Sequence, residues 1–210
     1  SKVNSDIVGK FANLASRSGP MLMKKLDGML GRLDEEGRKL VDMMLDSSEA
    51  VREDFENLRY SSAVRRIASL ADQANRYVEK VKPWETIKTD PEQTRSALTA
   101  IINSVRILTV YLKPVLPEFA AKIEKFLNIE QVSYQNIHNL LENHKINKFK
   151  RLIDRVEEGQ VTAMMEESKQ QEGPAEETSA AVDLKPECTI DDFVRLDLRV
   201  AMVTEAEKVE

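Results

Sequence analysis

One stretch decides the fold of this 210-residue chain: Asp90-Pro-Glu-Gln-Thr-Arg-Ser-Ala-Leu-Thr-Ala-Ile-Ile-Asn-Ser-Val-Arg-Ile-Leu-Thr-Val-Tyr-Leu112. It opens with an aspartate that can cap a helix, a proline at the first helical position and a glutamine placed to reach back to the cap. The apolar surface that follows is too wide for a peripheral helix, and it is formed by Ala97, Leu98, Ile101, Ile102, Val105, Leu108, Leu112 and, just beyond, Val115. We therefore predict a central helix with other helices packed around it.

Amphipathic helices are predicted on both sides of this central one. Apolar residues recur at helical spacing over residues 5–27, 34–58, 62–81 and 118–127. Ser5 and Asp34 are suitable N-caps, and Pro83 should end the third of these helices. Pro20 should kink or break the first helix, because proline lacks an amide donor and clashes with the carbonyl group of Ser16. The pattern predicts an all-α antiparallel helix bundle.

The C-terminal part of the chain has a different composition. We predict a helical domain over residues 1–169, in which residues 128–156 are less regular and 149–153 are extended. Residues 170–187 contain Gly-Pro and many Glu, Ser and Ala, which is typical of a flexible acidic linker. Residues 188–210 begin to alternate like a strand but are too few to close a barrel of the oligonucleotide-binding kind, so they are expected to be the start of one.

Composition excludes several classes of protein. Cys188 is the only cysteine, which excludes an internal disulfide and a multi-cysteine zinc site. No stretch is long enough to span a membrane, and no signal pattern is present, so a soluble protein is expected. The net charge of −5 does not argue against RNA as a partner. Residues 166–187 carry seven acids and two bases, hence 2 − 7 = −5, and the remainder is formally neutral.

Nothing in the sequence predicts catalysis. The two histidines, His138 and His144, have no nucleophile or spaced metal ligand beside them in the sequence, and we expect surface or structural roles for both. No glycine-rich loop of the kind that holds nucleotide phosphates is present. We therefore predict no catalytic, cofactor-binding or metal-binding residue in this chain.

Three residues have the chemistry needed to hold unpaired bases. Asn13 and Arg17 are four positions apart and share one helix face, and Trp84, the only tryptophan, follows a helix-ending proline. An amide and a guanidinium can read base edges, and an indole offers a surface for stacking. Nearby lysines could contact phosphates: Lys10, Lys24, Lys25, Lys80, Lys82 and Lys88. Taken singly, each of these residues also fits an ordinary solvated face or a hydrophobic plug.

Several separated motifs occur in the order found in bacterial methionyl-tRNA synthetases. They are Val3-Asn-Ser-Asp-Ile-Val8, Asn13-Leu-Ala-Ser-Arg17, Ala71-Asp72 through Glu79, Pro83-Trp84, Tyr111-Leu-Lys-Pro-Val-Leu-Pro117 and His144-Lys-Ile-Asn147. Up to about residue 170 the chain resembles the anticodon-binding domain of that family. Thr189-Ile-Asp-Asp-Phe193 and Asp197-Leu-Arg-Val-Ala201 are similar to the start of its C-terminal tRNA-binding domain.

One segment departs from the family pattern. After Arg17 the family usually continues through a glycine and an aromatic residue to Phe-Asp-Gly. Here the chain reads Ser18-Gly-Pro-Met21 and then Leu26-Asp-Gly28. A proline at position 20 therefore puts the direction of the Arg17 side chain in question.

The resemblance implies a function that composition alone does not. It implies that Asn13, Arg17 and Trp84 meet the anticodon of methionine tRNA, in a cytoplasmic enzyme that attaches methionine to that tRNA. It implies that ATP binds to a catalytic domain outside this chain and leaves undecided whether that domain also binds zinc. The signatures His-Ile-Gly-His and Lys-Met-Ser-Lys-Ser, which are absent here, would lie in that domain. Neither DNA nor a membrane is an expected partner. Dimerisation is expected through the rest of the C-terminal domain, and this part alone is expected to be a monomer.

Two alternatives remain at this point. The first is the related helical domain of another class I synthetase, such as those for isoleucine, valine, leucine or cysteine, which would prefer a different anticodon. The second is a helical interaction module with no RNA role, in which Trp84 belongs to the core. The preferred tRNA distinguishes the first alternative from a domain that binds methionine tRNA. The environment of the indole distinguishes the second alternative from an RNA-binding domain.

Overall fold

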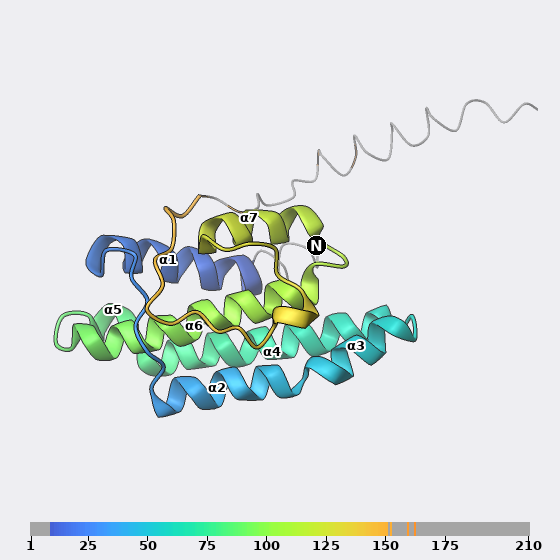
Figure 1. The fold of residues 1–210 in the computed structure, drawn as a ribbon, viewed down its shortest axis with the longest axis horizontal. Helices are drawn as coiled ribbons and strands as arrows, with labels where there is room; N and C mark the ends of the chain where they lie inside the picture. Colours follow the sequence, from blue (N-terminus) through green and yellow to red (C-terminus); the bar gives the residue numbers. More distant parts are fainter. Residues whose placement is uncertain (1–8, 151, 153–158, 160–161, 163–210) are drawn as a thin grey trace, which may run out of the picture. The chain divides into compact units, whose positions relative to one another are not determined.

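Figure 1 shows the chain as a computed structural model, which describes residues 9–150, 152, 159 and 162. The chain divides into two compact units, Ser1–Glu158 and Gly159–Glu210. The helices described below all belong to the first unit. The expected linker over 170–187 and the expected start of a second domain over 188–210 lie outside the described residues, so the predicted domain boundaries stay predictions.

The described part of the first unit is helical. Its elements are α1 (Asn13–Lys25), α2 (Glu35–Asp46), α3 (Ser48–Glu56), α4 (Tyr60–Val81), α5 (Pro83–Thr86), α6 (Pro91–Leu112), α7 (Pro117–Leu127) and the 3-10 helix η2 (Tyr134–Asn136). The extended pairing found in residues 9–150 is a single antiparallel bridge between Met29 and Lys145. The prediction of an all-α helix bundle is confirmed. No helix of the described ranges is long and apolar enough to cross a membrane.

Helix α6 is the centre of the bundle, as predicted. It lies among the other helices (Figure 1) and packs against α1, α2, α3, α4, α5 and α7. Every residue from Ala97 to Leu112 is buried. Its start is capped as expected, because the Asp90 carboxylate accepts a hydrogen bond from the backbone N–H of Gln93 at 2.9 Å. The glutamine side chain does not reach back, however. It donates to Asp34 at 2.7 Å, and so joins the cap of α6 to the cap of α2.

Two of the predicted helix boundaries are wrong. α1 continues through Pro20, where a kink or a break was expected, so the helix does not break there. The lost amide bond is tolerated because Leu14, Ala15 and Leu22 are fully buried, and tertiary packing rather than local hydrogen bonding supplies most of a helix's stability. The helix expected over residues 34–58 is two helices, interrupted at Ser47, whose hydroxyl donates to the Met43 carbonyl group one turn earlier. The expected cap at Ser5 lies outside the described residues.

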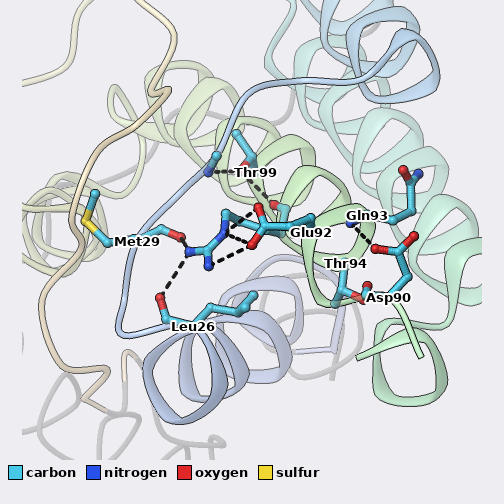
Figure 2. A network of polar contacts seen from close by, with 9 residues as sticks. Leu26, Met29, Asp90, Glu92, Gln93, Thr94 and Thr99 are labelled. Carbon is cyan, nitrogen blue, oxygen red and sulfur yellow. Dashed lines mark hydrogen bonds and ion pairs between the residues drawn. The ribbon is translucent and has the colours of Figure 1, made fainter. Parts of the chain in front are cut away.

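Arg95 fixes the end of α1 against α6. Its guanidinium donates to the carbonyl oxygens of Leu26 at 3.3 Å and Met29 at 2.9 Å, and it pairs with Glu92 at 3.2 Å (Figure 2). Beside it, the hydroxyl of Thr99 accepts from the backbone N–H of Gly31 at 2.9 Å. These contacts hold the turn that follows α1, and α1 carries two of the three candidate RNA-binding residues.

The segment after α7 has little regular structure of its own, as predicted, and is held by polar side chains of α6. Arg106 donates to the carbonyl oxygens of Ile137 at 2.7 Å and Asn136 at 2.5 Å. The amide of Asn103 both donates to and accepts from the backbone of Leu141, at 2.9 and 2.7 Å. Because Asn103 and Arg106 are themselves buried, these bonds satisfy groups that would otherwise be costly to keep in the core.

A buried carboxylate closes the corner between α3 and α4. Asp54 is 3% exposed and accepts hydrogen bonds from Arg59, Ser62 and Arg66, at 3.0 to 3.1 Å. Burial alone would raise the pKa of this carboxyl group, but the three donors outweigh that effect and hold the pKa below its usual value.

Candidate nucleic-acid interface

The fold brings Arg17 and Trp84 together. Arg17 projects from α1, and Trp84 lies at the corner where α4 turns into α5. The turn is made by Lys82, whose φ of 42° is left-handed, and Pro83 then starts α5. The guanidinium carbon of Arg17 lies 4.9 Å from the centroid of the indole ring, within range of a cation–π contact.

A carboxylate on α4 holds Arg17 from a second side. One guanidinium nitrogen of Arg17 lies 2.8 Å from the carboxylate of Glu79. The Arg17 side chain is still 38% exposed. The arrangement presents a directed guanidinium fork at the surface, next to an aromatic ring.

An open hollow of about 530 Å³ adjoins this pair. It is lined by Arg17, Pro20, Met21, Lys24, Lys25, Trp84, Ile87 and Lys88. Half of these residues are cationic, the other half are apolar, and none is an acid. A larger hollow of about 660 Å³ lies near the start of α6, but aspartate and glutamate contribute to its lining and no aromatic residue does. The lining of the hollow beside Trp84 therefore suits a stacked base and its phosphates.

Pro20 does not disturb the direction of the Arg17 side chain. The proline lies within α1 and lines the same hollow, and Arg17 is directed at Trp84. The departure from the family pattern therefore does not turn Arg17 away from the indole.

Asn13 is the least well placed of the three predicted residues. It lies one helical turn before Arg17 on α1 and is half-buried, but it does not line the hollow. Trp84 is also half-buried and packs in part against the core. The indole therefore has both a buried part, as a hydrophobic plug would, and a part that lines the hollow.

The structure divides the six candidate lysines into two groups. Lys24, Lys25 and Lys88 line the hollow. The other three are in ion pairs: Lys10 with Asp72, Lys80 with Glu36 and Lys82 with Glu85. Sequence reasoning missed Met21 and Ile87, although they lie four residues after Arg17 and three after Trp84, the spacing at which helical neighbours share a face.

The described residues contain no candidate metal site. Among them, no three or more His, Cys, Asp or Glu side chains are grouped so as to hold a metal ion. His144 has a structural role, as expected, because its Nε2 atom is 2.7 Å from the carbonyl oxygen of Leu127.

Comparison with known proteins places this geometry in a family. Residues 28–170 match the family described as the anticodon binding domain of methionyl tRNA ligase. The whole chain is 39% identical over 216 residues to a methionine–tRNA ligase of Neisseria meningitidis serogroup C, covering 31% of that protein. It is 35% identical over 227 residues to a methionine–tRNA ligase of Bdellovibrio bacteriovorus, covering 33% of it. The chain thus spans about a third of the length of these relatives.

The fold of this chain is also similar to that of a solved methionyl-tRNA synthetase. The apo form of Mycobacterium tuberculosis methionyl-tRNA synthetase superposes with a TM-score of 0.70 at 26% identity, over 74% of this chain and 34% of that one. Trp84 falls within the range of the family match, whereas Asn13 and Arg17 precede it and are included in the alignments to the two relatives, which span the whole chain. Because the family match covers more than half of the chain, this chain belongs to the family of methionyl-tRNA ligase anticodon-binding domains.

Proposed function

We propose that this domain reads the anticodon of methionine tRNA with Trp84, Arg17 and Asn13. The observation that carries the proposal is the Arg17 guanidinium 4.9 Å from the Trp84 ring, at a hollow lined by Lys24 and Lys25. An anticodon loop is single-stranded, so it exposes base edges and faces that a duplex hides. An aromatic face, a donor fork and nearby ammonium groups are complementary to such a loop.

Arg17 must give up part of its present contacts when a base stacks on Trp84. An exposed ion pair such as that with Glu79 is worth about 0–1 kcal/mol, and an exposed cation–π contact about 0.5–1 kcal/mol. A base–aromatic stack returns roughly 1–3 kcal/mol, and a bidentate contact to a base edge a similar amount. The exchange is therefore favourable when the guanidinium finds a matching base edge, and costly when it does not. This difference is the proposed source of triplet selectivity.

Asn13 and the lysines complete the proposed interface. The Asn13 amide has both a donor and an acceptor, which suits a base edge. It lies one turn from Arg17 on α1 and does not line the hollow, so we assign it a neighbouring base rather than the one on Trp84. Lys24, Lys25 and Lys88 are assigned to backbone phosphates, which position the loop without reading its sequence.

For the whole protein we propose a division of labour. A catalytic domain outside this chain uses ATP to join methionine to the acceptor end of the tRNA, while this domain, itself non-catalytic, holds the anticodon. The proposed setting is the cytoplasm. Any dimer forms through the C-terminal region, and the helical domain alone is a monomer.

Arg17→Gln tests the proposal. Wild-type protein should bind an anticodon stem-loop with the methionine triplet at least about tenfold more tightly than one with a changed triplet. In the variant, the ratio of the two affinities should fall by roughly tenfold, because one bidentate base contact is worth about 1–3 kcal/mol. Filter binding with the two stem-loops measures both numbers.

Arg65→Gln is the matched control. Arg65 is exposed on α4, its guanidinium donates to the Ser61 carbonyl oxygen, and it is not among the described residues that line the hollow. Its removal should therefore leave the preference intact. Wild-type protein that binds both stem-loops equally would contradict the proposal. Preference for the triplet of another class I synthetase would indicate the first alternative, and no RNA binding at all would indicate an interaction module.

A further inference from the structure

A second basic hollow lies where α7 meets the segment after the 3-10 helix. Its volume is about 200 Å³, and its lining residues are Lys122, Lys125, Phe126, Lys148, Lys150 and Leu152. Phe126 and Leu152 are buried and form an apolar floor, and all four lysines are exposed. We call these four lysines the α7 lysine cluster.

These lysines differ from most other cations of the bundle, because no carboxylate of the described residues pairs with them. Elsewhere ion pairs are common, as in Lys39–Glu35, Arg52–Glu49 and Lys113–Glu124. In the described part of the chain, no member of the α7 lysine cluster has an ion pair. Lys122 donates to the carbonyl oxygen of Leu152 at 3.1 Å, although Glu118 lies one turn earlier on α7. Like charges gathered without counter-charges repel one another, and an external polyanion relieves that repulsion.

Two adjacent residues of α1 connect the hollow beside Trp84 with the one at the α7 lysine cluster. Pro20 lines that hollow, while its neighbour Gly19 is buried against Phe126, the floor of the second hollow. A Cβ atom on Gly19 would lie only 2.7 Å from the Phe126 ring, so α1 and α7 approach closely at this point. Phe126 and Phe149 stack edge to face, with centroids 5.4 Å apart, and bring the segment that bears Lys148 and Lys150 to the same place.

This geometry sets the scale of the ligand. An α-helix with its side chains is about 10–12 Å across, so a path half-way around α1 is roughly 16–19 Å long. Successive phosphates of one strand in a duplex lie about 3.4 Å apart along the axis. Such a path therefore corresponds to about five phosphates, which is within the reach of a stem continuing from a bound loop.

We propose that the α7 lysine cluster binds backbone phosphates of the tRNA stem next to the anticodon loop. The inference deepens the proposed function, because it takes the RNA held at Trp84 as the ligand. Among the described residues that line the hollow, lysine supplies the only hydrogen-bonding side chains, so the contact is with phosphate and does not depend on base sequence. The cluster thus adds affinity and orientation, and leaves triplet selectivity to Arg17 and Trp84.

The test is the triple variant Lys125→Gln, Lys148→Gln and Lys150→Gln. Glutamine keeps much of the side-chain length and removes the charge. Binding of stem-loops with the methionine triplet and with a changed triplet should weaken by the same factor, about tenfold near 0.15 M salt. The slope of log affinity against log salt should fall by about two, since each lost phosphate contact removes roughly 0.7–0.9. The control variant Lys39→Gln, Arg52→Gln and Arg65→Gln removes equal charge from α2, α3 and α4, and should change neither quantity.

Each outcome decides the inference. A triple variant that binds like the control variant would overturn it. So would unchanged RNA binding together with faster proteolysis within residues 166–187, since the occupant of the cluster would then be the chain's own acidic segment. A lower affinity that leaves the triplet preference intact supports it. If wild-type protein shows no triplet preference but the triple variant still loses affinity and salt slope, the anticodon proposal fails while the phosphate site stands.

Discussion

Trp84→Ala should lower the affinity of this domain for methionine tRNA by roughly tenfold or more. The indole is half-buried and lines the hollow beside Arg17, so its loss removes the surface on which a base can stack. One base–aromatic stack is worth about 1–3 kcal/mol, which corresponds to about five- to 150-fold in affinity. Arg17 also loses the ring that helps to hold it. Filter binding with methionine tRNA measures the change, and does not depend on the fluorescence of the residue removed.

A second substitution separates stacking from packing. Trp84→Phe keeps an aromatic face and should recover most of the affinity, whereas Trp84→Leu fills part of the space without a stacking surface and should not. Thermal melting of all three variants establishes that each is folded at the temperature of the binding assay. Wild-type affinity in a folded Trp84→Ala protein would remove the indole from the site.

Arg106→Met should lower the free energy of unfolding by about 3 kcal/mol, since one hydrogen bond from a charged group contributes about 1.5–3 kcal/mol and more than one is lost. Arg106 is only 3% exposed, and it donates to the carbonyl oxygens of Asn136 and Ile137. Methionine occupies similar space but donates nothing, so these carbonyl groups lose their charged partner. Urea denaturation followed by circular dichroism measures the difference.

The control for Arg106 is Arg65→Met, on the exposed face of α4. That substitution should change the free energy of unfolding by no more than about 0.5 kcal/mol, as is usual for surface positions. Equal stability of the two variants would contradict the view that α6 side chains hold the segment after α7. The same segment leads to Lys148 and Lys150, so this tether also bears on the position of the second basic hollow.

The sequence predicts the helices well where local chemistry decides them. The Asp90 and Asp34 caps, the end of α4 before Pro83 and the buried surface of α6 all follow from short patterns that the structure confirms. Pro20 was misjudged because its local cost is offset by burial of the residues around it, which no local rule contains. The tethers from Asn103 and Arg106 were not predictable for a related reason. Their partners are backbone groups 38 and 31 residues away. Because every residue has a backbone carbonyl group, the residue type does not show which one accepts the bond.

The sequence predicted the contact between two of the three candidate site residues better than the residues around them. Helical spacing and the family resemblance indicated Asn13, Arg17 and Trp84, and the structure brings Arg17 and Trp84 into contact. Which lysines stay available depends on which carboxylates lie near them in three dimensions. Lys80 meets Glu36 from another helix, whereas Lys88 lines the hollow. The ion pair of Arg17 with Glu79 joins α1 to α4 in the same way, and sequence spacing does not reveal it.

The most direct test of the anticodon site is the intrinsic fluorescence of Trp84, since the chain has no other tryptophan. The protein would be titrated with the anticodon stem-loop of methionine tRNA and, separately, with the same stem-loop carrying a changed triplet. We predict saturable quenching by the first, because a base stacks on the indole, and a midpoint about tenfold or more higher for the second. A blue-shifted emission that responds to neither RNA would contradict the account.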